Sequence, residues 1–117
     1  MQQIFIELWS YKQAWHDLGE AGRADYVAKL GPAIADVLAL GIEVIAWGHN
    51  RQDVDMRVDY DFFAVYRVPD EAAFAALQSA VSASGWYDYF LHANAGGIAS
   101  TSESVLGDHI SLATQKP

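Results

Sequence analysis

The sequence predicts an α+β domain in which two helices cover one face of a four-stranded antiparallel sheet. Segments with strand composition and segments with helical periodicity alternate in the order β-α-β-β-α-β, and a short helical segment follows. The chain has 117 residues, of which 52% are hydrophobic, and both figures suit one globular domain. We therefore expect a single domain over residues 1–117.

The first half of the chain predicts a strand, a long helix and a second strand. Ile4–Trp9 is rich in β-branched and aromatic residues, as strands are, and a polar connection with a short helical turn over 12–18 follows. A helix is expected over Glu20–Leu40, where apolar residues recur at spacings of three and four. Pro32 predicts a kink or break near Gly31, because proline removes one backbone hydrogen bond. The second strand is expected at 43–49.

The second half predicts a third strand at 60–67, a second helix and a fourth strand. Asp70 has the residue type of a helix N-cap, and the helix is expected to end at Gly85. The alternation in Trp86–Ala93 predicts the fourth strand, although a helical continuation through residues 86 and 87 stays open. Gly96 and Gly97 suggest a turn.

A short C-terminal helix is expected to about Ile110, because Ser100 and Glu103 have the spacing of a capping box. The whole order of elements matches the split βαβ, or ferredoxin-like, arrangement.

Both faces of the predicted sheet are apolar, although two helices can cover only one of them. Strict alternation places mostly aliphatic side chains on a face suited to helices, with Tyr60 and Tyr66 at its ends: Ile4, Ile6, Leu8, Val44, Ala46, Phe62 and Ala64. The other face would carry most of the aromatic residues together with several ionisable ones: Phe5, Glu7, Trp9, Ile45, Trp47, His49, Phe63, Val65, Trp86, Phe90 and His92. An exposed patch with so many aromatic side chains favours a homodimer in which the sheet faces pack against each other. The alternative is that the C-terminal helix folds back over this face.

Several stretches resemble the dimeric α+β barrel superfamily, which includes antibiotic-biosynthesis monooxygenases, YCII-like and EthD-like proteins. The stretches are IFIELW, LGPAI, YDFFAVYRVPD and SGWYDYF, and more narrowly they are similar to an uncharacterised bacterial family within it. The resemblance covers about Gln3 to Ile110. It implies a barrel of two sheets with a ligand-sized pocket in each protomer, and it implies no particular chemistry.

Glu7, His49 and His92 are the candidate catalytic residues. A carboxylate within an apolar strand is expected to be desolvated, which raises its pKa and suits a general base or an anchor for a polar ligand group. Two imidazoles on the same face could move protons or bind a metal. The structural alternative is that Glu7 pairs with Arg67 and that His49 is solvated at a strand end.

The aromatic residues of the same face are the candidate ligand-binding residues: Phe5, Trp9, Trp47, Phe63 and Trp86. They predict a pocket for a planar or apolar molecule, with dimer-interface packing as the alternative.

Composition excludes several functions. The formal net charge of −8 opposes binding to nucleic acids and to acidic membranes, and the chain has no cysteine for disulfides or thiolate sites. No signal peptide or membrane span is evident, so we expect a soluble cytoplasmic protein. The acidic segment 53–59 lacks the glycine and late glutamate of a calcium loop. We expect no metal site and no cofactor, and no residue marks a haem ligand.

Two hypotheses follow from these residues. The first is a protein that binds a small apolar or aromatic molecule, with cofactor-free oxygenation, isomerisation or proton transfer as its possible chemistry. The second is a non-catalytic dimeric module, structural or stress-related, with a packed inner face. A cavity lined by ionisable groups would favour the first.

Overall fold

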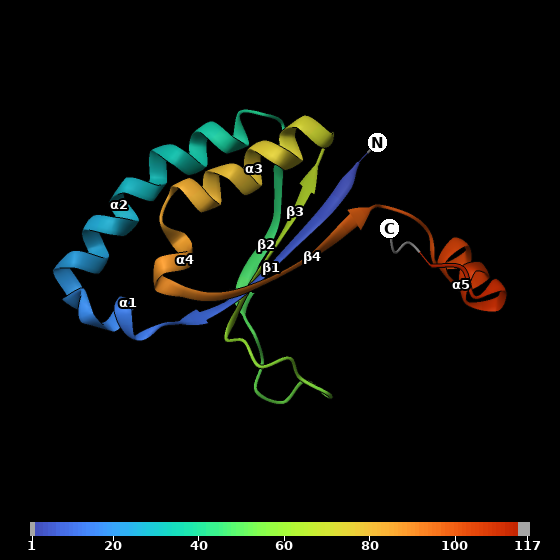
Figure 1. Ribbon diagram of the computed structural model, residues 1–117, viewed down its shortest axis with the longest axis horizontal. Coiled ribbons are helices and arrows are strands. Elements are labelled where there is room, and N and C mark those ends of the chain that lie inside the picture. The colour runs from blue at the N-terminus through green and yellow to red at the C-terminus, as the bar shows by residue number, and fades with distance from the viewer. Residues whose placement is uncertain (1, 115–117) are drawn as a thin grey trace.

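A computed structural model describes residues 2–114 and contains one four-stranded antiparallel sheet, shown in Figure 1. The strands are β1 (Gln3–Tyr11), β2 (Glu43–His49), β3 (Phe62–Val68) and β4 (Phe90–Ile98), in the spatial order β2-β3-β1-β4. Each neighbouring pair is antiparallel, with β1 between β3 and β4. The ferredoxin-like arrangement predicted from the sequence is therefore confirmed.

The two long helices, α2 (Gly19–Leu38) and α3 (Glu71–Ala83), lie side by side over one face of the sheet (Figure 1). Asp70 caps α3, because its side chain accepts a hydrogen bond from the Ala73 amide at 2.8 Å. Of the predicted kink or break in the first long helix, the break is wrong, since α2 continues through Pro32. Its C-terminal turn leads to Gly41, whose φ of +88° suits glycine.

Three shorter helices complete the chain: α1 (Gln13–Asp17), α4 (Trp86–Tyr89) and α5 (Ser102–Ser111). Helix α5 was expected, but its cap is Thr101, whose hydroxyl accepts from the Ser104 amide at 3.1 Å. The predicted fourth strand is wrong in position. Residues 86–89 form one helical turn after Gly85, and β4 runs on through Gly96 and Gly97, where a turn was expected.

The predicted faces of β1 are reversed in the structure. Phe5, Glu7 and Trp9 are buried beneath the helices, while Ile4, Ile6 and Leu8 lie on the open face. Opposite Phe5, Glu7 and Trp9 across the ladder lie Tyr66, Ala64 and Phe62 of β3, so these residues share the helix-covered face. Alternation alone separates two sets of residues, but it does not say which set the helices cover when both are apolar.

A β-bulge explains the faces of β2. The register with β3 shifts between Val44 and Ala46, so that one extra residue, Ile45, stands in the strand. As a result Val44 and Trp47, three residues apart, lie opposite Tyr66 and Ala64, on the helix-covered face. Strict alternation had placed Val44 and Trp47 on different faces.

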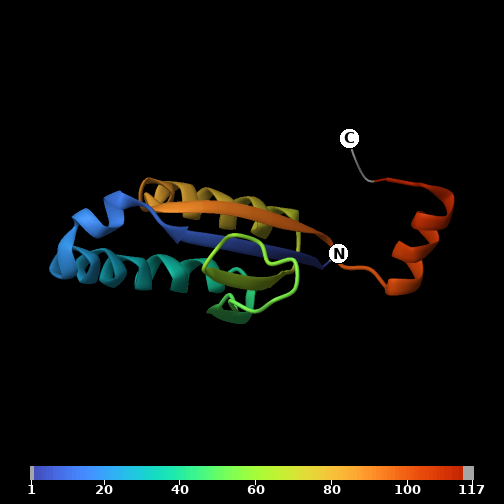
Figure 2. The ribbon, with the colours of Figure 1, turned by 90° about the horizontal axis from the view of Figure 1, so that it is seen from below.

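The face of the sheet away from α2 and α3 carries apolar side chains without a helix over them. Its residues come from all four strands and include Ile4, Ile6, Leu8, Ala46, Phe63, Val65 and Leu91. Helix α5 does not cover this face: Figure 2 shows it standing beyond the end of the sheet. Its Ile110 is 88% exposed. The alternative in which the C-terminal helix folds back over the face is therefore not what the chain adopts.

Within residues 2–114, no helix is long and apolar enough to cross a membrane.

Candidate functional site

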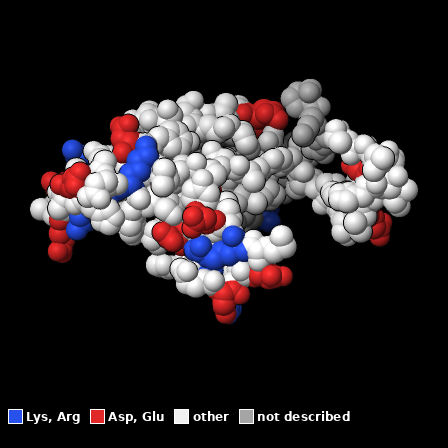
Figure 3. Space-filling view, turned by 60° about the horizontal axis from the view of Figure 1, so that its bottom comes forward, with Lys and Arg blue, Asp and Glu red and all other residues white. Residues whose placement is uncertain are grey.

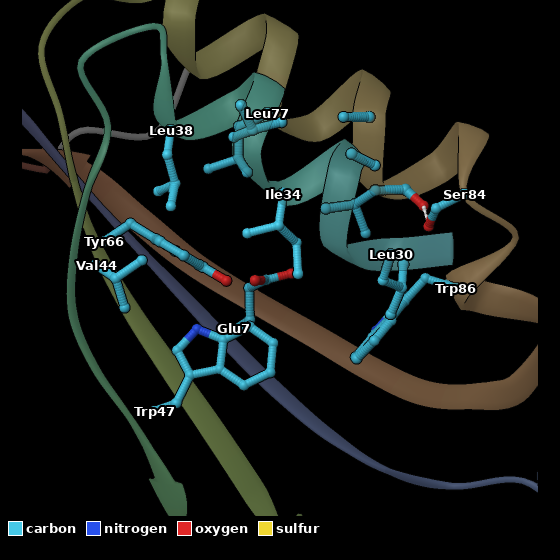
Figure 4. Close-up of a pocket in the computed structure, with 14 residues that line it drawn as sticks. Glu7, Leu30, Ile34, Leu38, Val44, Trp47, Tyr66, Leu77, Ser84 and Trp86 are labelled. Atoms are coloured by element: carbon cyan, nitrogen blue, oxygen red, sulfur yellow. Dashed lines mark hydrogen bonds between the residues drawn. The ribbon is translucent and has the colours of Figure 1, made fainter. Parts of the chain in front are cut away.

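A pocket of about 270 Å³ lies between the helices and the sheet, and Figure 4 shows it with its side chains. Its walls are mainly aliphatic and aromatic, from α2, α3, α4 and three strands: Glu7, Leu30, Ala33, Ile34, Val37, Leu38, Val44, Trp47, Tyr66, Leu77, Ala80, Val81, Ser84 and Trp86. The structure describes all twenty residues of α2, and none of them is fully buried. The apolar stripe of α2 therefore faces the pocket instead of a packed core.

Glu7 is the carboxylate of this pocket. It comes from the middle of β1, and only 4% of its surface is exposed. Its side chain points up from the sheet toward Ile34 of α2, with Trp47 beside it (Figure 4). Burial raises the pKa of Glu7 above its ordinary value, and a hydrogen bond from Tyr66 opposes this rise in part. A carboxyl group of this kind exchanges protons at higher pH than an exposed glutamate does.

Tyr66 and Trp47 form one arm of a polar network around Glu7. The Tyr66 hydroxyl donates a hydrogen bond to the Glu7 carboxylate and accepts one from the indole N–H of Trp47. Burial, followed by the adjacent negative charge of Glu7, raises the pKa of Tyr66 above its ordinary value. Tyr66 therefore remains a neutral donor that orients the carboxylate.

His92 and Trp86 form the other arm. The indole N–H of Trp86 donates to His92 Nδ1 at 3.0 Å, and His92 Nε2 lies 2.5 Å from Asn94 Oδ1 and 3.5 Å from Glu7 Oε2. Because an indole N–H can only donate, Nδ1 carries no proton, and neutral His92 is protonated at Nε2. Burial lowers the pKa of His92, which favours this neutral form.

The candidate residues from the sequence divide into two groups. Glu7, Trp47 and Trp86 line the pocket. His92 does not line it, but its Nε2 lies 3.5 Å from Glu7 Oε2. Trp9 packs between these two tryptophans, with ring centroids 5.1 Å from Trp47 and 5.4 Å from Trp86. Phe5 lies in the same core, against the rings of Tyr66 and Phe74.

Two candidates lie elsewhere. His49 is exposed at the end of β2, with its ring edge-on to Phe62 at 5.2 Å, and it does not line the pocket. Phe63 belongs to the open face of the sheet. The predicted pair of His49 and His92 is therefore not formed. The histidine next to Glu7 is His92 alone.

The sequence reasoning missed Tyr66, Asn94 and the aliphatic wall from α2. Tyr66 had been placed on the opposite face from Glu7, because the register of β1 against β3 was not known. The sequence does show the apolar stripe that includes Leu30 and Ile34, but its spacing does not distinguish a pocket wall from an ordinary core contact. Asn94 lies in the part of β4 that was expected to be past the end of the strand.

The acidic loop between β2 and β3 pairs most of its aspartates with its own two arginines, and Figure 3 shows its blue and red side chains gathered together. Arg51 pairs with Asp53 at 2.9 Å, and Arg57 lies 3.6 Å from Asp61 and 3.9 Å from Asp59. In the described part of the chain, no three histidine, aspartate or glutamate side chains are grouped as metal ligands.

Comparison with solved structures identifies the fold. The chain matches a proposed chlorite dismutase with a TM-score of 0.58 and 15% identity, covering 96% of this chain and 48% of that one. This chain thus spans about half the length of that protein. A dabb family protein with a ferredoxin-like fold from Mesorhizobium loti matches with a TM-score of 0.52 and 17% identity, covering 86% of this chain and 98% of that one. The similarity to dimeric α+β barrel proteins is confirmed as a similarity of fold.

No curated protein matches the chain. One family model does, the family of unknown function DUF6616, and it matches residues 2–112. Because that match includes every strand and helix described above, the chain belongs to the family of unknown function DUF6616.

Proposed function

We propose that this protein binds a small apolar or aromatic molecule in the pocket beneath α2, and that the Glu7 carboxyl exchanges a proton with it. The observation that carries this proposal is a buried carboxyl group on the floor of an apolar pocket of about 270 Å³. At roughly 30 Å³ per water molecule in the liquid, that volume corresponds to about nine waters, or to one aromatic ring with a short side chain.

The arrangement around Glu7 supports proton exchange. Tyr66 holds the carboxylate in place by a donated hydrogen bond, and His92 Nε2 faces it from 3.5 Å. Burial raises the pKa of Glu7 and lowers that of His92, which moves the two values toward each other and favours proton exchange at this position. Isomerisation and other cofactor-free proton-transfer reactions need a group with these properties.

The alternative of a non-catalytic module required a packed inner face. A pocket walled by α2, which has no fully buried residue, argues against that alternative.

The binding function is tested by filling the pocket. Ala80 lines it from α3, whereas Ala72 is exposed on the same helix. We expect benzyl alcohol and indole to raise the melting temperature of the wild type and of Ala72→Phe, and to leave that of Ala80→Phe unchanged. Equal stabilisation of all three proteins, or of none, would contradict the proposal.

The second part of the proposal is a homodimer through the open face of the sheet. This face carries aliphatic and aromatic side chains from all four strands, and both long helices lie on the other side. A two-fold arrangement of two such faces buries both, which a single chain does not achieve.

A further inference from the structure

The charges of the pocket select among possible ligands. Glu7 is the one acidic residue among the fourteen that line it, and within residues 2–114 no lysine or arginine joins them. The nearest basic group is His92, whose pKa burial lowers. An anionic ligand would therefore meet a carboxylate and no compensating cation, which disfavours carboxylic acids and phosphate esters.

The carboxylate retains capacity to accept hydrogen bonds. A carboxylate offers about four acceptor positions on its two oxygens. Tyr66 occupies one of them, and the Nε2 proton of His92 has Asn94 Oδ1 as its nearer acceptor, at 2.5 Å against 3.5 Å for Glu7 Oε2. A ligand in the pocket can therefore present a donor to Glu7.

Aromatic rings enclose the same position. Trp47 and Trp86 line the pocket on either side of Glu7, Tyr66 is hydrogen-bonded to it, and Trp9 packs between the two indoles. The faces of indole and phenol rings attract cations. A carboxylate next to several aromatic rings is a suitable environment for an organic ammonium group.

From these three observations we infer that the ligand of this pocket is an apolar molecule with one protonated amine, whose ammonium group pairs with Glu7 among Trp47, Trp86 and Tyr66. This inference rests on the proposed binding function and adds the class of ligand. The ammonium group supplies the cation that the buried carboxylate lacks, and the apolar remainder of the molecule packs against the aliphatic wall from α2. The net charge of −8 also draws cations toward the protein.

Three probes of similar size and different charge test the inference: benzylamine, benzyl alcohol and benzoate. We expect calorimetric titration of the wild type to give at least tenfold tighter binding for benzylamine than for benzyl alcohol, and no binding for benzoate. Glu7→Gln should remove the preference for benzylamine over the alcohol. Glu20→Gln removes the same charge at an exposed site in α2, and it should keep the preference.

A measurement on the wild type alone avoids dependence on the folding of Glu7→Gln. Benzylamine affinity should increase as pH rises through the pKa of Glu7, while benzyl alcohol affinity should stay constant. Equal affinity for the alcohol and the amine, or an amine affinity that does not change with pH, would overturn the amine assignment and leave the binding function intact. If none of the three probes binds, the binding function itself fails.

Discussion

Glu7 shows how one residue can be costly to the fold and useful to the site. A carboxylate with 4% exposure and no lysine or arginine among the pocket residues loses most of its hydration. The hydrogen bond from Tyr66 recovers part of that loss, and protonation recovers more. The charged form is therefore less stable in the folded protein than in the unfolded chain.

This difference predicts how stability depends on pH. The folded pKa of Glu7 lies above its ordinary value of 4.5, so between the two values the folded state keeps a proton that the unfolded state has lost. The contribution of Glu7 to the free energy of unfolding is therefore most favourable below pH 4.5. It decreases as pH rises toward the folded pKa, by about 1.4 kcal/mol per pH unit.

Urea unfolding of wild type and Glu7→Gln at a series of pH values measures this contribution. The free energy of unfolding of Glu7→Gln relative to wild type should increase with pH across that window and level off above it. His92 changes the free energy of unfolding in the opposite direction and at higher pH. Its folded pKa is lowered, so its stabilising contribution is lost as pH falls below 6.5. A constant difference between the two proteins from pH 4 upward would contradict the raised pKa of Glu7.

At the scale of the element, β4 depends on a glycine that its sequence seemed to place in a turn. A Cβ atom added at Gly96 would lie 2.6 Å from the backbone oxygen of Ile4, whereas one added at Gly97 would meet nothing within 4 Å. The close approach of β1 and β4 therefore requires glycine at 96 and not at 97.

The two glycines form a matched pair for experiment. Gly96→Ala should lower the free energy of unfolding by about 1–3 kcal/mol, because the backbone of β1 has to move away. Gly97→Ala should leave it close to that of the wild type. Denaturant unfolding of both variants checks this, and equal losses in the two would show that the contact with Ile4 is not the cause.

The existence of the strands was readable from the sequence, while their faces were not. Runs of β-branched and aromatic residues located β1, β2 and β3 to within about two residues. The face of β1 was assigned wrongly because the set that begins at Ile4 is wholly aliphatic, whereas the set that begins at Phe5 contains Glu7 and yet is the buried one. The bulge at Ile45 changed which residues of β2 face the helices, and the helical turn that begins at Trp86 moved the start of β4. Neither feature has a local sequence signal as strong as a proline or a helix cap.

Residues of the candidate site that stand out by their type could be predicted, whereas those that depend on strand register could not. Glu7 was recognisable because a charged residue interrupts an apolar strand, and Trp47 and Trp86 because they are large and aromatic. Tyr66 required the register of β3 against β1, which depends on contacts between residues about sixty positions apart. His92 was found, but its partner was expected to be His49.

For the whole molecule, the arrangement of layers leaves one face of the sheet uncovered. Both long helices occupy one side of the sheet, and α5 stands away from the other (Figures 1 and 2). A single helical layer leaves the open face of the sheet in water, and burial of that face against a second copy would be the driving force of the homodimer proposed above.

Substitution of one open-face residue should separate the two copies. Ile6 lies in β1 opposite Val65 and Ala95, at the centre of the open face. Sedimentation velocity should give a dimer for the wild type and a monomer for Ile6→Lys, because a lysine there would be buried without a partner. Val27→Lys, on the exposed side of α2, should remain a dimer. A wild-type chain that sediments as a monomer at tens of micromolar would contradict the dimer.

The cluster of indoles around Glu7 has an optical consequence. Three of the four tryptophans, Trp9, Trp47 and Trp86, lie together at the pocket, while Trp15 packs separately against Tyr89 and Phe90. Most of the indole rings of the protein therefore lie near one carboxyl group. The chain carries its own fluorescent reporter, whose colour and brightness follow what occupies the space beneath α2.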